Sequence, residues 1–390
     1  MLASLLLIAL TAAAPAPLTY YKAKVTSFAC TSIPETHRLE GLRGDAKAFQ
    51  MALIEKQVHG DTPPALAPDV ELLVGDVGDA DVADRALSRV DRVVHLAAVV
   101  GVGQSMYEID RYMRMNTMAT ATFLERVVPR RDTVERLVVA SSMSIYGEGE
   151  YLCDTHGNVV VTPRPEEQLA VREWECKCPA CGRELRPIPT SEAKPLLPTS
   201  VYAVSKRDHE ELCLVVGAAY GIPTVALRFF NVYGPGQSLS NPYTGVAAIF
   251  ASRLLNGNAP VIFEDGLQSR DFIHVSDIVE GIVLALEAPA AAGARINLGT
   301  GRPSTVDDVS AALARGLGIE VEPTRPGQYR AGDIRHCFAD PTLARTLLGF
   351  EASVTLEGGM AALVDWLGHQ TANDLVDQAT SELQTRGLAR

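Results

Sequence analysis

The sequence predicts an α/β protein built on a doubly wound parallel sheet, with a smaller lobe on its C-terminal side. Short apolar strands alternate with amphipathic helices from about residue 70 to 234, and the alternation becomes less regular after about residue 235. Such alternation is typical of a parallel sheet with helices on both faces. The 390 residues are 47% hydrophobic and 21% charged, which is typical of a folded chain with a large core.

The predicted elements follow one another in a regular order. The expected strands are 70–76, 91–99, 136–142 and 223–234, and the expected helices are 80–88, about 106–128 and 200–221. Gly221 closes the last helix. Ligands bind at the carboxyl ends of the strands in such sheets. Functional residues are therefore expected within 95–100, 141–144 and 229–231.

The charge balance excludes a general attraction to polyanions. Lys and Arg total 35 against 47 Asp and Glu, which gives a net charge of −12. Neither nucleic acid nor a membrane is therefore expected as a partner. The expected location is cytoplasmic. The uncharged residues 1–21, with an apolar run at 2–10, leave a signal peptide or anchor as an alternative, but the run lacks a basic start and is shorter than the ~20 residues of a membrane span.

Tyr202 and Lys206 form a candidate acid–base pair. They are four positions apart on the predicted helix 200–221, so both lie on one face. A lysine ammonium beside Tyr202 favours the phenolate and is expected to lower its pKa from ~10 toward neutrality. Such a tyrosine can take a proton from a sugar hydroxyl and return it, and Ser142 can hydrogen-bond the same hydroxyl. A surface Tyr and Lys is the alternative, because the bare pattern is common by chance.

Further motifs place this pair in a known context. They are SSMSIYG (141–147), RFFNVYGPG (228–236), SRDFIHVSD (269–277) and GDIRHCFAD (332–340). With them the sequence resembles the extended short-chain dehydrogenase/reductases, in particular the NAD-dependent nucleotide-sugar epimerases and dehydratases. The resemblance extends from about Gln57 to about Leu367 and implies a Rossmann-like fold. The stretch 241–257 and the loop before Tyr202 resemble bacterial dTDP-L-rhamnose 4-epimerases.

The resemblance implies NAD as the cofactor and a nucleotide-diphosphate sugar as the substrate of a homodimer. The implied catalytic residues are Ser142, Tyr202 and Lys206. The implied cofactor-binding residues are Asp76, Val77, Ala97, Ala98, Asn116, Ser141, Tyr202, Lys206 and Phe230. The implied substrate-binding residues are Ser142, Asn231, Arg270 and Arg335. The two arginines suit a diphosphate because a guanidinium fork matches phosphate oxygens.

The residues after Ser142 help to select the reaction. Dehydratases of the family have an Asp-Glu pair at the positions of Met143 and Ser144, which can act as neither acid nor base. Dehydration is therefore not expected. The expected reaction is epimerisation at carbon 4 through a keto sugar. A dTDP-L-rhamnose 4-epimerase is the leading expectation, a UDP-glucose 4-epimerase is the second, and a nucleotide-sugar reductase uses the same residues.

The connection from Tyr146 to Tyr202 is much longer than the usual ~4–6 residues and contains a cluster of cysteines. Cys153-x-x-His156 is followed by Cys178-x-x-Cys181, and two such pairs are typical of a closed, structural zinc site. A zinc-ribbon-like insertion is therefore expected. Free cysteines in a surface loop are the alternative, and Cys176 is a spare thiol that could compete as a ligand.

The N-terminal segment departs from the family. The only glycines within residues 22–56 are Gly41 and Gly44. The family has a Gly-x-x-Gly-x-x-Gly turn in this region, and its backbone approaches the cofactor pyrophosphate. Either residues 1–56 come from a shifted reading frame or splicing error, which is the favoured explanation, or the chain lacks the turn. In the second case an inactive sugar-nucleotide-binding protein is the alternative to an enzyme.

The expected organisation follows from these observations. It comprises an atypical N-terminal segment (1–56), a dinucleotide-binding domain (57–234) with the Cys-containing insertion (151–195), a mostly sugar-nucleotide-binding lobe (235–370) and a tail (371–390).

Overall fold

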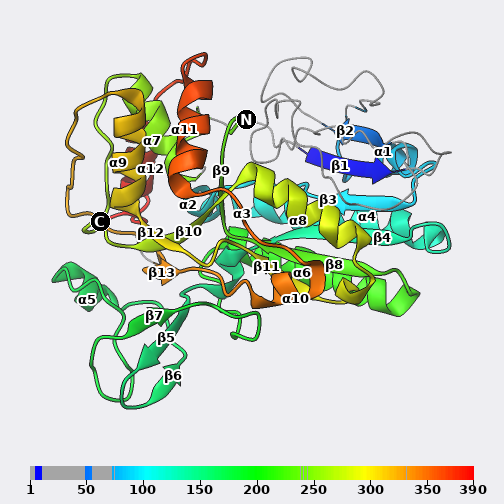
Figure 1. The fold of residues 1–390 in the computed structure, drawn as a ribbon, viewed down its shortest axis with the longest axis horizontal. Coiled ribbons are helices and arrows are strands. Elements are labelled where there is room, and N and C mark those ends of the chain that lie inside the picture. The colour runs from blue at the N-terminus through cyan, green and yellow to red at the C-terminus, as the bar shows by residue number, and fades with distance from the viewer. Residues whose placement is uncertain are drawn as a thin grey trace.

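The computed structural model describes residues 5–10, 49–54, 73, 75–237, 239, 241–243, 245–330 and 332–390. The predicted α/β class is confirmed, with a main sheet, a smaller sheet in a second lobe and a third sheet in the insertion (Figure 1). The main sheet has the order β11-β8-β4-β3-β1-β2. Its strands are β1 (Leu5–Leu10), β2 (Phe49–Ile54), β3 (Arg92–His95), β4 (Arg136–Ser142), β8 (Thr224–Phe229) and β11 (Arg295–Leu298).

The sheet is mixed rather than wholly parallel. Strands β3, β4, β8 and β11 are parallel as predicted, but β1 is antiparallel to both β3 and β2. The expected strand 70–76 is not found in its described part, because Leu73, Gly75 and Asp76 belong to no strand. Within residues 1–56 the structure describes only β1 and β2. The predictions of a signal-like run in 1–21 and of a missing glycine turn in 22–56 otherwise concern residues outside the described part.

Helices cover both faces of the main sheet. One face bears α1 (Ala80–Ala86), α4 (Ala119–Val127) and α6 (Val201–Tyr220), and the other bears α8 (Val275–Glu287) and α10 (Thr342–Leu348). Successive strand residues point to opposite faces, so Leu137 and Val139 of β4 pack under the first helices while Val138 packs under the second. Strand β4 is consequently buried along its whole length.

Helix α6 has well-defined ends that fix the start of the candidate site. Ser200 caps its first turn by accepting a hydrogen bond from the backbone N–H of Ala203, and Gly221 ends it in the left-handed conformation, as predicted. The segment packed against α6 comprises α2 (Val102–Ser105), α3 (Ile109–Tyr112) and the π-helical η1 (Met113–Met118). Short π-helical segments are frequent at functional sites.

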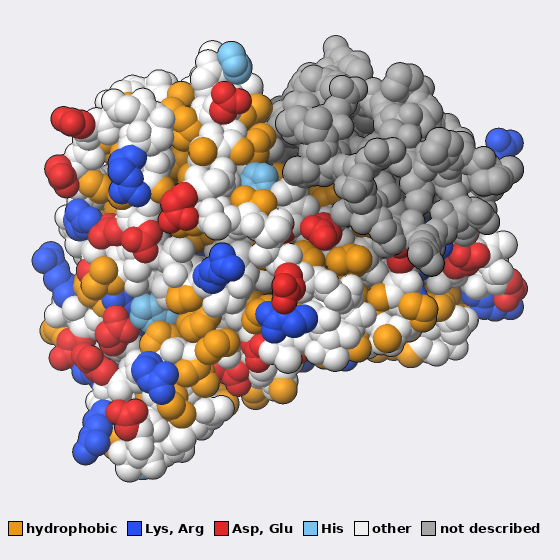
Figure 2. All heavy atoms as spheres, viewed as in Figure 1, with side chains coloured by type: hydrophobic (Ala, Val, Ile, Leu, Met, Phe, Trp, Pro, Cys, Tyr) orange, Lys and Arg blue, Asp and Glu red, His pale blue; other side chains and the backbone are white. Residues whose placement is uncertain are grey.

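The second lobe has a core of its own. It contains α7 (Val246–Leu255), α9 (Val306–Leu317), α11 (Leu356–Leu367) and α12 (Val376–Thr385), with a sheet of β9 (Asn231–Tyr233), β10 (Ser269–His274), β12 (Pro303–Thr305) and β13 (His336–Cys337). The chain then re-enters the first domain, because β11, α8 and α10 lie within 235–370 but pack on the main sheet. On the face shown in Figure 2, acidic and basic side chains are interspersed over this lobe.

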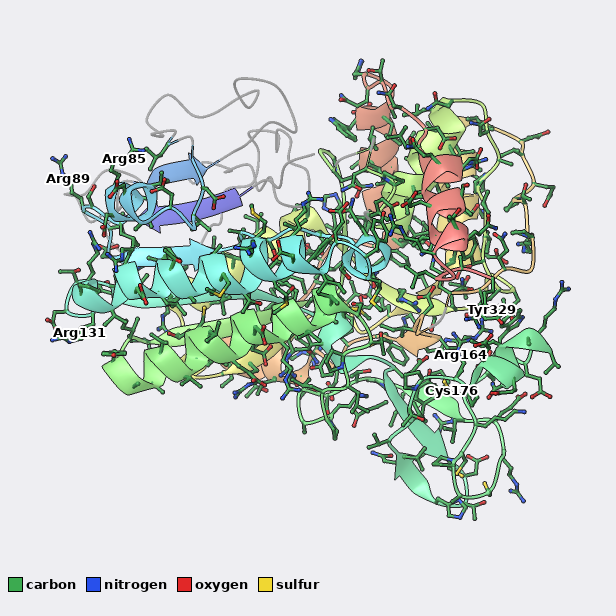
Figure 3. The ribbon with its side chains drawn as sticks, turned by 180° about the vertical axis from the view of Figure 1, so that it is seen from behind. Arg85, Arg89, Arg131, Arg164, Cys176 and Tyr329 are labelled. Atoms are coloured by element: carbon green, nitrogen blue, oxygen red, sulfur yellow. The ribbon has the colours of Figure 1, made fainter. Side chains whose placement is uncertain are left out.

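The insertion forms a small antiparallel sheet with the order β6-β5-β7, and it projects from the main body (Figure 1). Its elements are β5 (Glu150–Cys153), β6 (Gly157–Val159), α5 (Glu166–Ala170) and β7 (Arg186–Ile188). Arg164 connects it to the second lobe through a two-pronged ion pair with Glu264. Figure 3 shows Arg164 at this junction, together with Tyr329 of the lobe. Among the described residues, no helix is long and apolar enough to cross a membrane.

Candidate active site

The end of β4 and the first turn of α6 bring Ser142 and Tyr202 together, whereas Lys206, one turn further on, contacts His209 rather than Tyr202 in the described part of the chain. Ser142 is the last residue of β4, and Tyr202 and Lys206 lie on the buried face of α6, as the spacing predicts. Ser142 hydrogen-bonds Tyr202. Ser144 donates its hydroxyl hydrogen to Ser142 Oγ at 2.9 Å. A chain of hydroxyl groups therefore extends from Ser144 through Ser142 to Tyr202.

The prediction that Lys206 lowers the pKa of Tyr202 toward neutrality is wrong for the structure as it stands. Burial raises the pKa of Tyr202 to about 12, and the hydrogen bond from Ser142 lowers it only in part. Burial also lowers the pKa of Lys206 to about 7. The cause is the cost of placing a phenolate or an ammonium in a site shielded from water. Lys206 Nζ lies 3.4 Å from Nδ1 of His209, which is its hydrogen-bond partner among the described residues.

The end of β3 forms the wall expected to line the cofactor. Ala97 and Ala98 are buried directly after the strand. Asn116 bonds both the backbone N–H and the carbonyl of Val99, at 2.7 and 3.1 Å, and its Nδ2 also donates to Ser205 Oγ at 2.9 Å. Asn116 therefore braces the loop against α6, and its side chain is already committed within the protein.

The other residues expected at the cofactor differ in their surroundings. Ser141 Oγ is buried and has no hydrogen-bond partner among the described residues. Phe230 is buried beside Tyr146, with ring centroids 6.5 Å apart. Val77 is buried, and Asp76 accepts a hydrogen bond from the backbone N–H of Gly78 at 2.8 Å. An unpartnered hydroxyl, small alanines and a lysine with spare donors fit a bound dinucleotide.

Two of the residues expected at the substrate lie on neighbouring strands. Asn231 begins β9, which pairs with β10, the strand of Arg270. Asn231 Oδ1 is buried without a partner among the described residues, so it can accept a hydrogen bond from a ligand. The Arg270 guanidinium donates to the backbone carbonyls of Ser269, Ile334 and Arg335, and this holds it at the edge of the strand.

Arg335 is not brought to this site. Its side chain is 1% exposed, and its three guanidinium nitrogens are bound by Glu175, Glu264 and Asp265. The assignment of Arg335 to the substrate diphosphate is therefore not supported by its surroundings, because no donor is left. The carboxylate of Glu175 comes from the insertion, so this cluster joins the insertion to the second lobe.

Arg330 is a further candidate that the sequence motifs do not indicate. Its Nε is buried without a hydrogen-bond partner in the described part of the chain, and its guanidinium lies over the Phe263 ring, 4.6 Å from the centroid. An arginine with an unused donor is a better candidate for a phosphate than one enclosed by carboxylates. The available signal was the presence of a second arginine just before the GDIRH motif.

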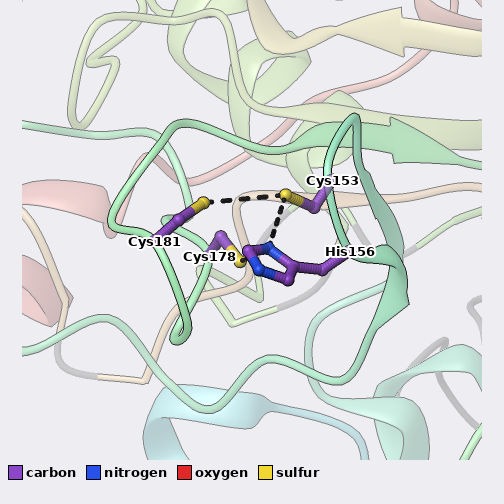
Figure 4. Close-up of side chains that lie close together, drawn as sticks. All are labelled: Cys153, His156, Cys178 and Cys181. Carbon is purple, nitrogen blue, oxygen red and sulfur yellow. Dashed lines mark hydrogen bonds between the residues drawn. The ribbon is translucent and has the colours of Figure 1, made fainter.

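The four predicted metal ligands converge at one end of the insertion (Figure 4). Cys153 Sγ lies 3.4 Å from His156 Nδ1 and 3.8 Å from Cys181 Sγ, and Cys178 Sγ lies 3.5 Å from His156 Nδ1. The pKa of the Cys153 thiol is lowered to about 6, first by the backbone N–H of Thr155 and then by His156. The thiolate that a metal requires is therefore favoured at Cys153. The pKa of Cys181 is instead raised, because the backbone N–H of Arg183, which lowers it, is outweighed by burial and the neighbouring Cys178 and Cys153.

Cys176 takes no part in this cluster. It is buried, and its thiol donates to Tyr151 Oη at 3.3 Å. Burial raises the pKa of Cys176, which disfavours the thiolate. The spare cysteine therefore has a different environment from the four convergent side chains.

Comparison with known proteins places the chain in a family. Residues 35–166 and 179–299 match the model of the NAD dependent epimerase/dehydratase family, and the gap between them falls within the insertion. The chain is 32% identical over 321 residues to a dTDP-L-rhamnose 4-epimerase of Burkholderia thailandensis, covering 81% of this chain and 87% of that protein. It is 30% identical to a UDP-glucose 4-epimerase of Mycolicibacterium smegmatis, covering 77% and 84%.

Solved structures agree with these matches. A UDP-glucose 4-epimerase of Thermotoga maritima with UDP-glucose has a TM-score of 0.65 and 27% identity, covering 80% of this chain and 88% of that one. A UDP-glucuronic acid 4-epimerase of Bacillus cereus with UDP-glucuronic acid and NAD has a TM-score of 0.62 and 26% identity, covering 78% and 83%. This chain belongs to the NAD-dependent epimerase/dehydratase family.

Proposed function

We propose that this protein is an NAD-dependent nucleotide-sugar 4-epimerase, with dTDP-L-rhamnose as the leading substrate. The observation that supports it most is the buried set of Ser142, Tyr202 and Lys206, joined to Ser144 instead of an acidic pair. The relative of known activity at 32% identity is a dTDP-L-rhamnose 4-epimerase. UDP-glucose is the second candidate substrate, because UDP-glucose 4-epimerases are also among the relatives.

Tyr202 acts as the acid–base group in this mechanism. Bound NAD would supply a reversible hydride acceptor for carbon 4 of the sugar. Tyr202 takes the proton of the carbon-4 hydroxyl as the keto sugar forms, and it returns the proton when the other face is reduced. Ser142 already accepts a hydrogen bond from Ser144, so its own hydrogen is free to stabilise the Tyr202 phenolate or the sugar oxygen. A charged Lys206 adds to this stabilisation.

The absence of a second acid–base pair after Ser142 favours epimerisation over elimination. Met143 is apolar and buried, and Ser144 has its hydroxyl committed to Ser142. Asn231 and Arg270 are proposed to hold the diphosphate while the sugar turns. Arg330 is proposed as a further diphosphate-binding arginine, because Arg335 has no free donor. Ala97, Ala98, Ser141, Lys206 and Phe230 are proposed to bind the cofactor.

The experiment is to incubate the purified protein with single nucleotide sugars and catalytic NAD, and to separate the products by chromatography. Conversion to the carbon-4 epimer without a net change in reduced nicotinamide supports the proposal. Stoichiometric consumption of NADPH would identify a reductase instead. Tight binding of a nucleotide sugar with no turnover of any sugar would identify a binding protein.

We also propose that zinc occupies the cluster of Cys153, His156, Cys178 and Cys181. Tetrahedral coordination with Zn–S of ~2.3 Å and Zn–N of ~2.0–2.1 Å requires separations of about 3.8 Å between sulfurs and about 3.5 Å between sulfur and nitrogen. Three of the separations, 3.8, 3.4 and 3.5 Å, agree with these values, and all four ligand atoms lie within 4.8 Å of one another. Four ligands leave no open position, so the zinc would be structural.

A second copy of this chain is the proposed partner. Met118 on η1 and Val204 and Val215 on α6 are 59%, 39% and 67% exposed, and these two helical segments pack side by side. A two-fold pairing through this face of η1 and α6 would bury them. Light scattering in solution tests the homodimer. The proposed location is cytoplasmic, which follows from the proposed cofactor and substrate.

A further inference from the structure

Behind the candidate active site, α6 places Lys206 and His209 one turn apart on its buried face. Lys206 is 2% exposed and His209 is fully buried. Lys206 Nζ lies 3.4 Å from His209 Nδ1. Side chains three positions apart on a helix are neighbours, so the contact is built into the α6 sequence. The proposed mechanism does not otherwise use His209.

His209 is itself held in a stack of rings. Its ring is stacked on that of His95, with centroids 5.2 Å apart and planes inclined by 23°, and His95 is stacked on Phe123 at 4.9 Å. His95 Nε2 lies 2.9 Å from Thr120 Oγ1 on α4. Strand β3, through His95, and helix α4, through Thr120 and Phe123, therefore restrict the orientation of the His209 ring that contacts Lys206.

Both histidines are uncharged at neutral pH. Burial, and then the charge of Lys206, lowers the pKa of His95 to about 3 and that of His209 well below its usual value. A neutral imidazole that accepts a hydrogen bond at Nδ1 must have its proton on Nε2. The backbone carbonyl of Asn116 opposes this lowering of the His209 pKa, although Nε2 of His209 is buried without a hydrogen-bond partner among the described residues.

Among the described residues, the other titratable groups near Lys206 form no ion pair with it, although Cys213 and Glu210 oppose the lowering of its pKa by burial. Glu210 binds Arg228 through both oxygens, at 2.9 and 2.6 Å. Burial raises the pKa of Cys213 to about 12, so its thiol stays neutral. His95 on β3 is neutral as well. His209 is therefore the group that holds the ammonium of Lys206 among the described residues.

We propose that His209 is a positioning residue for Lys206: its neutral ring accepts one N–H of the ammonium and leaves the other two available for the reaction. A lysine ammonium has three N–H groups, so one bond to His209 leaves two for the reaction. The consequence for catalysis rests on the proposed epimerase function. The effect on the protonation of Lys206 does not.

The test compares His209→Gln, whose side-chain oxygen can accept the same hydrogen bond, with His209→Leu, whose side chain cannot. The first measurement is NMR titration of ¹³Cε-labelled lysine, with the Lys206 signal assigned by Lys206→Met. A hydrogen bond to the charged form raises a pKa, so its loss in His209→Leu should lower the pKa of Lys206 by about one pH unit. His209→Gln should stay close to the wild type. This readout remains valid if no sugar is turned over.

The second measurement is the pH profile of kcat in the same variants. His209→Leu should lower kcat about 10-fold with an unchanged KM for the sugar nucleotide, and activity should be lost at a lower pH on the alkaline side. Leu214→Ala, on the same helix, controls for lost packing and should not move the profile. The proposal is overturned if His209→Leu leaves the Lys206 titration unchanged, or if His209→Gln is as impaired as His209→Leu in folded protein.

Discussion

Ser144 donates its hydroxyl hydrogen to Oγ of Ser142 at 2.9 Å, and its backbone N–H points to the same oxygen at 3.2 Å. Ser142 therefore has its acceptor capacity used and its own hydrogen free for Tyr202 or the substrate. Ser144 therefore orients Ser142, two residues before it. The resemblance to the family implies that a dehydratase has an acid–base residue at the position of Ser144.

Ser144→Ala should therefore reduce kcat by roughly 2- to 10-fold, which corresponds to one lost neutral hydrogen bond. Ser144→Thr keeps the hydroxyl and should retain activity within about 2-fold of the wild type. Steady-state kinetics on the best substrate of the panel measure both. Equal losses in the two variants would show that the hydroxyl is not the functional group.

Tyr202→Phe should reduce turnover by about 10²–10⁴-fold because it removes the acid–base hydroxyl. The thermal unfolding midpoint should change little, since the ring that packs against Tyr112 is retained. Tyr112→Phe is the matched control, because its ring is also buried and its hydroxyl hydrogen-bonds Gln104. Near-normal turnover in Tyr202→Phe would remove Tyr202 from the mechanism.

The two arginines near GDIRH should behave in opposite ways. Arg335→Met leaves the carboxylates of Glu175, Glu264 and Asp265 without their guanidinium, and loss of one partner from a buried pair costs about 3–5 kcal/mol of unfolding free energy. Because Glu175 and Asp265 are about 30% exposed, the lower end of this range is expected. Arg330→Gln should instead raise KM for the sugar nucleotide about 10-fold or more, with a smaller effect on stability.

Chemical denaturation and substrate kinetics on both variants separate these roles. A normal unfolding free energy in Arg335→Met, together with a raised KM, would restore the original assignment of Arg335 to the substrate.

The contrast between these arginines shows where local sequence patterns are sufficient. Tyr202 and Lys206 could be placed on one face because helical periodicity is local, and the Cys and His pairs because their spacing is short. The environment of Arg335 depends on Glu175, which is distant in sequence and belongs to the insertion. The pKa of Tyr202 likewise depends on burial by several elements, which the four-residue spacing does not contain.

The buried histidines predict a dependence of stability on acid pH. The pKa of His95 is lowered to about 3 in the fold, against ~6.5 in an unfolded chain. Between these values the unfolded chain binds a proton that the folded chain does not. The unfolding free energy should therefore fall as the pH falls, by up to about 1.4 kcal/mol per pH unit for each such histidine.

Urea denaturation at pH values between about 5 and 7 measures this slope. His95→Phe should have a shallower slope than the wild type because one of the two fully buried histidines, His95 and His209, is gone. His369→Gln, a change at an exposed position, should keep the slope of the wild type. An unchanged slope in His95→Phe would show that His95 does not contribute to the acid sensitivity.

The cysteines of the insertion allow the zinc proposal to be tested with a matched pair. Elemental analysis of protein purified without added metal should find about one zinc per chain, as expected for a four-ligand structural site. Cys181→Ser removes a ligand and should lose most of the metal, whereas Cys176→Ser changes a thiol bonded to Tyr151 and should retain it. Both substitutions replace sulfur by oxygen, so the difference between them isolates coordination.

Loss of zinc should also weaken the junction between the insertion and the second lobe. Cys153 ends β5, and Glu148, just before this strand, accepts the backbone N–H of Arg335. Chelation should therefore lower the thermal midpoint of the wild type and of Cys176→Ser, but not that of Cys181→Ser, which has already lost the metal. Well-folded wild-type protein without zinc, or equal metal loss in the two variants, would show that the four side chains converge without binding a metal.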